Sequence, residues 1–171
     1  MNIALIGFRG TGKTTLCRKL AKRLRMRFID TDREIVKIAG KNIPQIFSEK
    51  GEEGFREIEK KAVEKVSAED NQCIACGGGV ALDNGNVENL KRNSVLILLE
   101  AGPETIFARI RRDRNRPALT KKNGMEEVLH LLNERRPFYE KAARFRVDTS
   151  DAVVEESVQE IIDLLNAEGL L

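Results

Sequence analysis

The chain has 171 residues, of which 41% are hydrophobic and 33% are charged. At roughly 100–200 residues per domain, this length predicts one domain spanning residues 1–171. The formal net charge of +3 is too small to indicate nucleic-acid or membrane binding by itself, and no apolar run approaches the ~20 residues of a membrane-spanning helix.

The first predicted elements are a buried strand and an amphipathic helix. Residues 2–6 are nearly all apolar and stop at Gly7, a pattern typical of a strand that is buried on both faces. Residues 14–25 place three leucines on one helical stripe, with basic side chains around it. A strand followed directly by a helix is the start of an α/β unit.

The turn between these two elements carries a phosphate-binding motif. Residues 7–14 read GFRGTGKT and match G-x-x-x-x-G-K-[ST]. Glycines let the backbone curl so that N–H groups point at phosphate oxygens, and the helix start adds its positive dipole end. The Lys13 ammonium can then bind the β- and γ-phosphates, and the Thr14 hydroxyl can ligate Mg²⁺. An ordinary glycine-rich turn would not require these residue types in this order, so we predict nucleoside triphosphate binding.

Two aspartates follow the second predicted strand, residues 27–29. Asp30 and Asp32 would lie on the same side if the strand ran through them, at the sheet edge where parallel sheets bind ligands. One carboxylate could then hold a metal-bound water while the other accepts a proton from an attacking hydroxyl. Alternatively, either aspartate could cap the next helix, which we expect over residues 31–39. The sequence leaves both interpretations open.

The next segment predicts an arginine that is oriented by a carboxylate. Residues 43–66 are expected to form one or two helices, interrupted near residues 51–54. Arg56 and Glu59 stand three apart there and could pair on one helix face. An arginine held in this way can grip the carboxylate of a ligand in a bidentate fashion. The alternative interpretation is an ordinary surface ion pair.

Three cysteines are present, and two of them belong to a predicted strand over residues 72–76. The spacing of Cys73 and Cys76 could indicate a zinc or redox site. A strand would direct the two thiols to opposite faces, however, and no second cysteine pair completes a metal site. We therefore interpret them as buried strand thiols. The odd count, completed by Cys17, favours a reducing cytoplasmic location.

Three consecutive glycines, Gly77 to Gly79, end this strand abruptly. They remove side chains and expose backbone N–H groups, which a close approach to a ligand requires. Residues 95–99 form the strongest apolar run of the chain and predict a central strand. Pro103 then fits the first turn of a helix that we expect over residues 105–112.

Five arginines stand between residues 109 and 116. One interpretation is contact with nucleic acid. The other is a lid, over residues 112–124, that closes guanidinium groups over transferring phosphates. We favour the lid, because a phosphate-binding loop is present and the chain has only one tyrosine and no tryptophan to stack on bases.

The C-terminal part predicts two helices with a strand between them. A helix is expected over residues 125–143, with a kink or break at Pro137. A short strand over residues 145–147 and a helix with a clean apolar stripe over residues 154–165 follow. The alternation of strands and helices along the chain predicts an α/β sandwich around a mainly parallel sheet.

Taken together, the motifs resemble those of the shikimate kinase family, which belongs to the P-loop NTPases of the nucleoside-monophosphate-kinase type. The resemblance implies a three-layer sandwich with a five-stranded parallel sheet in the order 2-3-1-4-5, an acceptor-binding region over residues 32–60 and a mobile lid over residues 112–124. The matching segments follow in the family's order and span most of the chain: residues 7–14, 28–32, 46–47, 54–59, 77–79, 114–119 and 134–139.

The same resemblance implies ATP-dependent phosphorylation of the 3-hydroxyl of shikimate, giving shikimate 3-phosphate and ADP on the route to chorismate and the aromatic amino acids. It implies that Lys13 and Arg116 act on the transferring phosphate and that Arg112 lies near the adenine. Thr14 and, through water, Asp30 would hold Mg²⁺. The nucleotide would be bound by Gly10, Thr11, Gly12, Lys13, Thr14, Thr15, Arg112 and Arg116.

On the acceptor side, the resemblance assigns the central role to Asp32. This aspartate would bind the substrate hydroxyls and act as, or stand near, the catalytic base. Arg56 and Arg135 would bind the shikimate carboxylate, with Glu59 orienting Arg56. The remaining substrate-binding residues would be the glycines Gly77, Gly78 and Gly79 and an apolar wall of Phe47 and Phe55.

Two other functions remain open. A P-loop kinase for another small acceptor, such as gluconate or a nucleotide, would share the first motifs, although the scarce aromatic residues offer little on which a second base could stack. A nucleotide-gated regulatory protein would use the arginine segment on a partner. For the kinase we expect a monomer with no nucleic-acid or membrane partner. The only histidine, His130, has no evident partner and is given no role.

Overall fold

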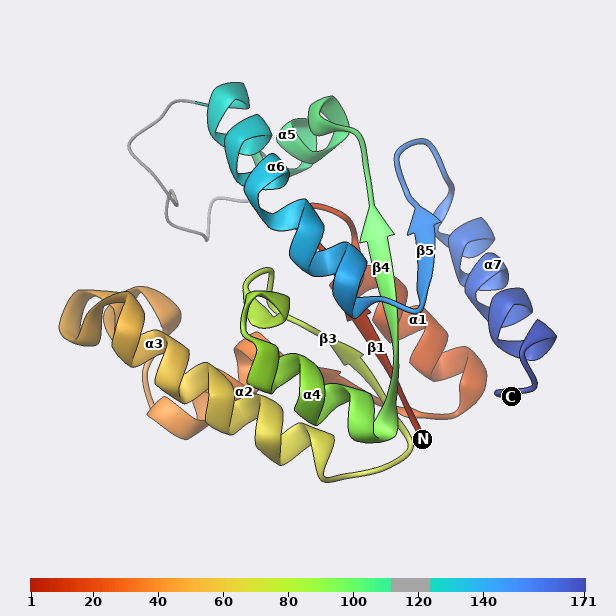
Figure 1. Ribbon diagram of the computed structural model, residues 1–171, viewed down its shortest axis with the longest axis horizontal. Coiled ribbons are helices and arrows are strands. Elements are labelled where there is room, and N and C mark those ends of the chain that lie inside the picture. The colour runs from red at the N-terminus through yellow and green to blue at the C-terminus, as the bar shows by residue number, and fades with distance from the viewer. Residues whose placement is uncertain (112–123) are drawn as a thin grey trace.

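A parallel sheet of five strands lies at the centre of the protein, in a computed structural model that describes residues 1–111 and 124–171 (Figure 1). The strand order is β2-β3-β1-β4-β5, which confirms the expected fold class. β1 lies between β3 and β4, with Ala4 opposite Ile74 on one side and Leu96 on the other. The strands are β1 (Asn2–Ile6), β2 (Arg27–Asp30), β3 (Gln72–Ala75), β4 (Ser94–Glu100) and β5 (Phe145–Asp148).

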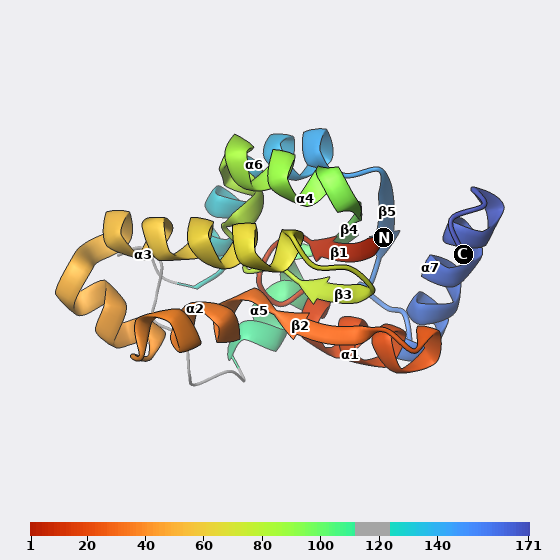
Figure 2. The ribbon, with the colours of Figure 1, turned by 90° about the horizontal axis from the view of Figure 1, so that it is seen from below.

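Helices cover both faces of the sheet and give the expected three layers (Figure 2). The helices are α1 (Lys13–Leu24), α2 (Thr31–Ala39), α3 (Ile43–Ser67), α4 (Asn84–Asn93), α5 (Pro103–Arg111), α6 (Met125–Ala142) and α7 (Val154–Ala167). Because strand side chains alternate, Ile3 and Leu5 pack under α1 and α7, while Ala4 and Ile6 pack under α3, α4 and α6. A third apolar cluster joins α2 to α3 at the side of the sheet.

Two local features differ from the expectation. Helix α4 and a short 3₁₀ turn, η1 (Val80–Leu82), were not predicted from the sequence. The α4 sequence, NGNVENLKRN, is mostly polar and buries only Leu90 among its apolar residues, so its stripe is weak. Helix α6 does not end at Pro137 but continues through it. The interruption expected in residues 43–66 is present at Gly51, whose φ of 66° and ψ of −170° are not helical.

The three cysteines are free and buried, which confirms the structural interpretation. Cys73 points to the face covered by α1, where its sulfur lies 3.0 Å from that of Cys17. Cys76, directly after β3, packs in the cluster on the opposite face. Burial raises the pKa of the Cys17 thiol far above its ordinary value and that of Cys76 to about 12. Within residues 1–111 and 124–171, no group of three or more metal-ligating side chains is assembled.

No helix in the described part of the chain combines the length and the apolar character that crossing a membrane requires.

A buried carboxylate links α2 to α3, the helices that carry the predicted acceptor residues. Glu34 is 6% exposed and accepts hydrogen bonds from Lys37, at 2.5 Å, and from Lys65 of α3, at 3.1 Å. The bond from Lys37 lowers the pKa of Glu34 below its ordinary value of 4.5, against the effect of burial, and Lys65 adds to it. Glu34 therefore stabilises the folded state in its ionised form.

Replacing Glu34 by glutamine should lower the free energy of unfolding by about 1 kcal/mol at pH 7. A carboxylate with a lowered folded pKa contributes stability above its unfolded pKa and loses that contribution as the pH falls through the folded pKa. The difference between the two proteins should therefore shrink below pH 4.5 and then disappear. Urea unfolding at several pH values measures it, and a difference that does not change with pH would contradict this origin.

Candidate active site

The phosphate-binding motif forms a tight loop between β1 and α1. Gly7 has a φ of 136°, and an ideal Cβ built on it would lie 2.4 Å from the carbonyl oxygen of Leu99 on β4, so only glycine fits there. Gly12, with a φ of 89°, precedes the first helical residue, Lys13. The loop therefore aims the N-terminus of α1, with its positive dipole end, at the carboxyl edge of the sheet.

The polar side chains of the motif differ in where they point. The Lys13 ammonium donates hydrogen bonds to the carbonyl oxygens of Gly7 and Phe8, both at 2.7 Å. The Thr14 hydroxyl points toward β2 and donates to Oδ2 of Asp30 at 3.2 Å. Thr11, in contrast, is buried, and its hydroxyl donates back to the carbonyl of Phe8. Its side chain supports the loop and does not line the cleft described below.

Of the two aspartates, Asp30 has the capping role that the sequence left open. β2 ends at Asp30 and α2 begins at Thr31, so the strand does not run through Asp32. Oδ1 of Asp30 caps α2 by accepting from the N–H groups of Asp32 and Arg33, at 3.0 and 3.4 Å. Oδ2 of the same carboxylate accepts from Thr14. Asp30 is thus a helix cap that also pairs with the phosphate loop, while the Asp32 carboxylate is not part of the cap.

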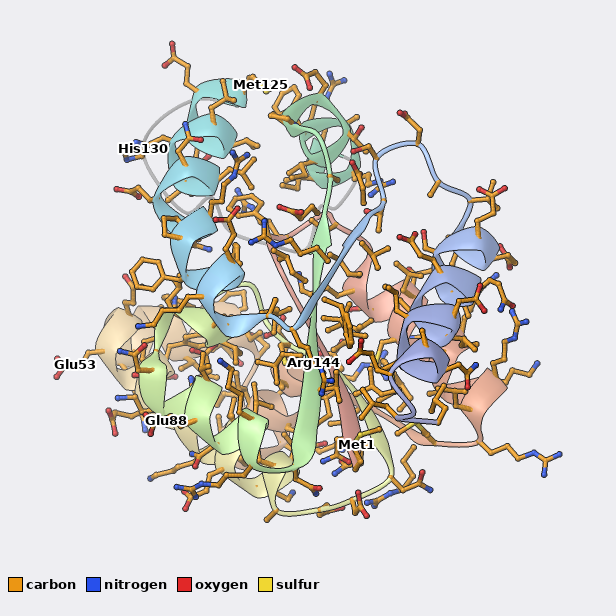
Figure 3. All side chains as sticks on the ribbon, turned by 45° about the vertical axis from the view of Figure 1, so that its right-hand side comes forward. Met1, Glu53, Glu88, Met125, His130 and Arg144 are labelled. Atoms are coloured by element: carbon orange, nitrogen blue, oxygen red, sulfur yellow. The ribbon has the colours of Figure 1, made fainter. Side chains whose placement is uncertain are left out.

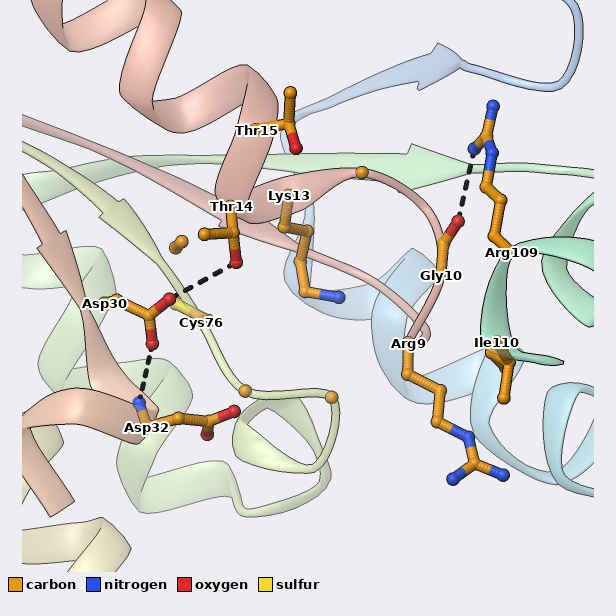
Figure 4. Close-up of a pocket in the computed structure, with 14 residues that line it drawn as sticks. Arg9, Gly10, Lys13, Thr14, Thr15, Asp30, Asp32, Cys76, Arg109 and Ile110 are labelled. Carbon is orange, nitrogen blue, oxygen red and sulfur yellow. Dashed lines mark hydrogen bonds between the residues drawn. The ribbon is translucent and has the colours of Figure 1, made fainter. Parts of the chain in front are cut away.

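These residues border a cleft of about 300 Å³, a volume at the lower end of the range of ligand pockets. Figure 4 shows Thr14, Asp30 and Asp32 on one side of the cleft and Arg9 and Arg109 on the other. The cleft is lined by Arg9, Gly10, Gly12, Lys13, Thr14, Thr15, Asp30, Asp32, Ala75, Cys76, Gly77, Gly78, Arg109 and Ile110. Most of the predicted nucleotide-binding residues in the described part of the chain are therefore together.

The glycine run after β3 lies against side chains of both predicted binding regions. Gly77 donates its N–H to the Thr31 hydroxyl at 2.8 Å, and an ideal Cβ on it would lie 2.6 Å from Oδ1 of Asp32. An ideal Cβ on Gly79 would lie 2.2 Å from Nη1 of Arg56. Asp32 and Arg56 can occupy these positions because neither glycine has a side chain.

The predicted arginine–carboxylate pair joins a half-buried guanidinium to a buried carboxylate and is therefore not an ordinary exposed surface pair. Nη1 of Arg56 lies 2.8 Å from Oε1 of Glu59, which is 1% exposed, and its Nη2 lies 3.2 Å from the exposed Glu52. Burial opposes the charge of Arg56, but Glu59 and Glu52 together hold its pKa above the ordinary value. Burial raises the pKa of Glu59, against the pull of Arg56. The guanidinium stays charged, and since it has five N–H donors, those that Glu59 and Glu52 do not use can bind an anion.

The second predicted arginine of the acceptor site comes from α6. Nη1 of Arg135 would lie 3.9 Å from a Cβ on Gly78, and its guanidinium lies over the Phe8 ring, 5.6 Å from the ring centre. The expected aromatic pair is also assembled, with the rings of Phe47 and Phe55 stacked 4.6 Å apart. Phe55 and Arg56 are in contact as well, at 5.4 Å from guanidinium to ring centre.

Two arginines that line the cleft were not predicted as site residues from the sequence. Arg109 donates to the carbonyl oxygens of Gly10, at 3.2 Å, and Thr149, at 2.7 Å, and so connects α5 to the phosphate loop and to the loop after β5. Arg9, inside the motif, lies 3.9 Å from Glu127 of α6. The expected lid residues Arg112 and Arg116 lie outside the described residues, and so does the expected lid except Gly124.

His130 lies away from the cleft. Figure 3 shows its side chain on the outer side of α6, pointing away from the body of the protein. The imidazole is 47% exposed and lies 3.4 Å from Glu134, one turn further along the helix. The expectation that His130 lacks a partner was therefore wrong, although this surface pair gives it no place in the cleft.

The chain is similar to shikimate kinases over nearly its whole length. A family model described as shikimate kinase matches residues 9–166. The chain is 45% identical to a shikimate kinase of Caldanaerobacter subterraneus, covering 94% of each protein, and 44% identical to one of Pelotomaculum thermopropionicum, covering 96% of this chain and 95% of that protein. A solved structure, the shikimate kinase from Acinetobacter baumannii in complex with shikimate, has a TM-score of 0.93 and 34% identity, covering 99% of this chain and 95% of that one.

Proposed function

The chain belongs to the shikimate kinase family, and we propose that its cleft transfers the γ-phosphoryl group of ATP to the 3-hydroxyl of shikimate. The products are shikimate 3-phosphate and ADP, on the route to chorismate and the aromatic amino acids. One observation carries the proposal: Asp32 lines the phosphate-loop cleft and lies against Gly77, while Arg56, paired with Glu59, lies against Gly79 in the same glycine run. An acid with a reactive hydroxyl needs such a cationic site beside an acceptor of its proton.

The phosphate loop binds the triphosphate. Backbone N–H groups from Gly10 to Thr15 and the N-terminus of α1 face the phosphate oxygens, and the Lys13 ammonium exchanges its carbonyl partners for the β- and γ-phosphates. The hydroxyl oxygen of Thr14 and a carboxylate oxygen of Asp30 lie 3.2 Å apart. Mg²⁺ prefers oxygen ligands of this kind. These two residues would hold the ion, directly and through water, and the ion would neutralise charge on the phosphates.

Asp32 accepts the proton of the attacking hydroxyl. The hydroxyl oxygen forms a bond to the γ-phosphorus while the bond from that phosphorus to the bridging oxygen of ADP breaks. Asp32 borders the same cleft as Lys13, so the acceptor and the triphosphate meet between them. Arg56 and Arg135 bind the shikimate carboxylate, with Phe47 and Phe55 as the apolar wall. The protein contributes chiefly positioning and charge neutralisation.

We also propose how the domain and its parts are organised. We propose one kinase domain over residues 1–171, with its acceptor region at 32–60 and a lid at 112–124 that brings Arg116 to the transferring phosphate and Arg112 toward the adenine. The contacts of Arg109 with Gly10 and Thr149 support a role for it, too, on the nucleotide side. We expect the enzyme to act as a monomer in the cytoplasm, without nucleic-acid or membrane partners.

A coupled assay of ADP release over a panel of acceptors tests the function. Shikimate should support Mg²⁺-dependent turnover, while gluconate and nucleoside monophosphates should not. Turnover with gluconate or a nucleotide, and none with shikimate, would show a kinase for another acceptor. Tight ATP binding with no acceptor-dependent turnover, together with nucleic-acid affinity that falls steeply with salt, would indicate a regulatory protein.

Replacing Arg56 by lysine should raise the KM for shikimate about tenfold and leave the KM for ATP unchanged. A lysine ammonium is a point charge, so it cannot contact Glu59 and a ligand carboxylate through a planar fork. Arg27→Lys is the matched control, because Arg27 forms an exposed ion pair with Glu69. It lies at the start of β2, whereas Asp30, which lines the cleft, lies at the end of that strand. Steady-state kinetics with each substrate varied in turn measure both constants, and equal changes in the two would count against the carboxylate role.

A further inference from the structure

Tyr139 connects α6 to the glycine run. It is the only tyrosine of the chain, it is 3% exposed, and its hydroxyl donates to the carbonyl oxygen of Gly78 at 2.6 Å. Burial raises the pKa of Tyr139 to about 12, although Arg135 and Arg56 pull it down. The phenol therefore keeps its proton and remains a donor throughout the neutral range.

Both arginines of the proposed acceptor site lie near this hydrogen bond. Arg135 precedes Tyr139 by one helical turn on α6, and Nη1 of its guanidinium would lie 3.9 Å from an ideal Cβ on Gly78. On the other flank, the next residue of the run, Gly79, lies against the Arg56 guanidinium. The Tyr139 bond thus joins the helix that carries one arginine to the loop that the other arginine contacts.

The bond also fixes the orientation of a peptide unit. The chain contains no cis peptide bond in its described part, so the Gly79 N–H points opposite to the Gly78 carbonyl, away from Tyr139. Gly77 is held in turn by the hydroxyl of Thr31, next to Asp32. Thr31 and Tyr139 therefore hold adjacent glycines, one beside the aspartate and one beside Arg135. Three consecutive glycines would otherwise have wide conformational freedom.

We propose that Tyr139 is a positioning residue for the acid acceptor, which keeps the glycine run docked on α6 so that Arg56 and Arg135 stand at the spacing one carboxylate requires. The inference rests on the proposed function and deepens it. Tyr139 does not line the cleft, so its effect reaches shikimate through the two arginines and the glycine backbone. The alternative is that Tyr139 is a core residue whose hydroxyl bonds to Gly78 only because a buried hydroxyl needs a partner. In that case Tyr139→Phe should lower stability and change no kinetic constant.

The test is Tyr139→Phe, which removes the hydroxyl and leaves the ring in place. We expect the KM for shikimate to rise about tenfold, because the buried Gly78 carbonyl loses its donor and the loop shifts. The kcat and the KM for ATP should stay at the wild-type values. Thermal stabilisation by shikimate should weaken in parallel, while that by ADP should not. An unchanged KM for shikimate, or equal rises in both KM values, would overturn the proposal.

Val128→Ala is the matched control for stability. Val128 is buried to 2% exposure on α6 and packs in the core below that helix, so its truncation weakens α6 without touching Gly78. It should lower the melting temperature and leave both KM values unchanged. If it raised the KM for shikimate as Tyr139→Phe does, the effect would belong to helix stability and the positioning role would be refuted.

A double-mutant cycle with Arg135→Lys gives a second readout. If Tyr139 acts through the arginines, Tyr139→Phe should raise the KM for shikimate only slightly once Arg135 is replaced. The free-energy change of the double variant should then be well below the sum of the two single changes. Full additivity would refute the coupling. The wild-type enzyme separates the two levels of inference: no turnover with shikimate contradicts the proposed function itself, whereas an active wild type with an unaltered Tyr139→Phe variant contradicts only the role of Tyr139.

Discussion

Asp32→Asn should lower kcat with shikimate by about 10³-fold, while ATP binds nearly as in the wild type. The amide keeps the size of the carboxylate and can still contact a hydroxyl, but it cannot accept the proton that leaves as the oxygen bonds to phosphorus. The backbone N–H of Asp32 remains bonded to Asp30 and the side chain still faces Gly77, so we expect no change of shape. Coupled ADP release measures kcat, and titration calorimetry measures ATP binding.

The matched control removes one negative charge elsewhere. Asp70 pairs with the amino group of Met1 just before β3, at the opposite end of the sheet from the cleft. Asp70→Asn should therefore leave kcat unchanged. Turnover by Asp32→Asn near the wild-type rate would refute the assignment of Asp32 as the base. A loss of ATP binding in this variant would show instead that Asp32 acts on the nucleotide.

Features that depend on local sequence could be predicted closely. The phosphate-binding loop is one, because its glycines, Lys13 and Thr14 occupy fixed offsets between a strand and a helix, and each offset has a direct geometric reason. The opposite faces of Cys73 and Cys76 are another, since alternation along β3 decides them. The order of the strands, in contrast, was expected from the family resemblance, because strand pairing between distant segments leaves no local signal.

The double role of Asp30 could not be predicted from the sequence. Capping and pairing with Thr14 appear as alternatives in the sequence, but the carboxylate has two oxygens and uses one for each. The second contact exists because α1 packs next to β2, which brings Thr14 to Asp30. Arg109 was missed for a similar reason, because its partners Gly10 and Thr149 lie 99 and 40 residues away and nothing distinguishes it from the arginines that follow.

Helix α4 was missed because its sequence is polar, yet one signal was available. Asp83 accepts a hydrogen bond from the N–H of Asn86 and so caps the helix. A connection between two parallel strands, β3 and β4, also has to cross over the sheet, usually with a helix. Reasoning from topology would therefore have placed a helix in residues 84–93, where periodicity alone did not.

Gly79→Ala should lower kcat/KM for shikimate by about 10²-fold, almost entirely through the KM. The new methyl group would overlap Nη1 of Arg56, since the ideal Cβ lies 2.2 Å from it and 2.7 Å from the guanidinium carbon. The overlapped group is the end of a flexible side chain, so the guanidinium moves and the fold remains. We expect a lower melting temperature, because the displaced guanidinium weakens the pair with the buried Glu59, and an unchanged KM for ATP.

The neighbouring glycines separate the two halves of the site, because each added methyl group meets a different side chain. An ideal Cβ on Gly77 lies 2.6 Å from Oδ1 of Asp32, so Gly77→Ala displaces the base and should lower kcat rather than raise the KM for shikimate. On Gly78 the nearest atom, the backbone nitrogen of Arg9, is at 3.5 Å, an ordinary contact, so Gly78→Ala should have the smallest effect of the three. If all three variants lost activity to the same degree and through the same constant, the glycine run would act only as a flexible connection, and the separate placement of Asp32 and Arg56 against it would be refuted.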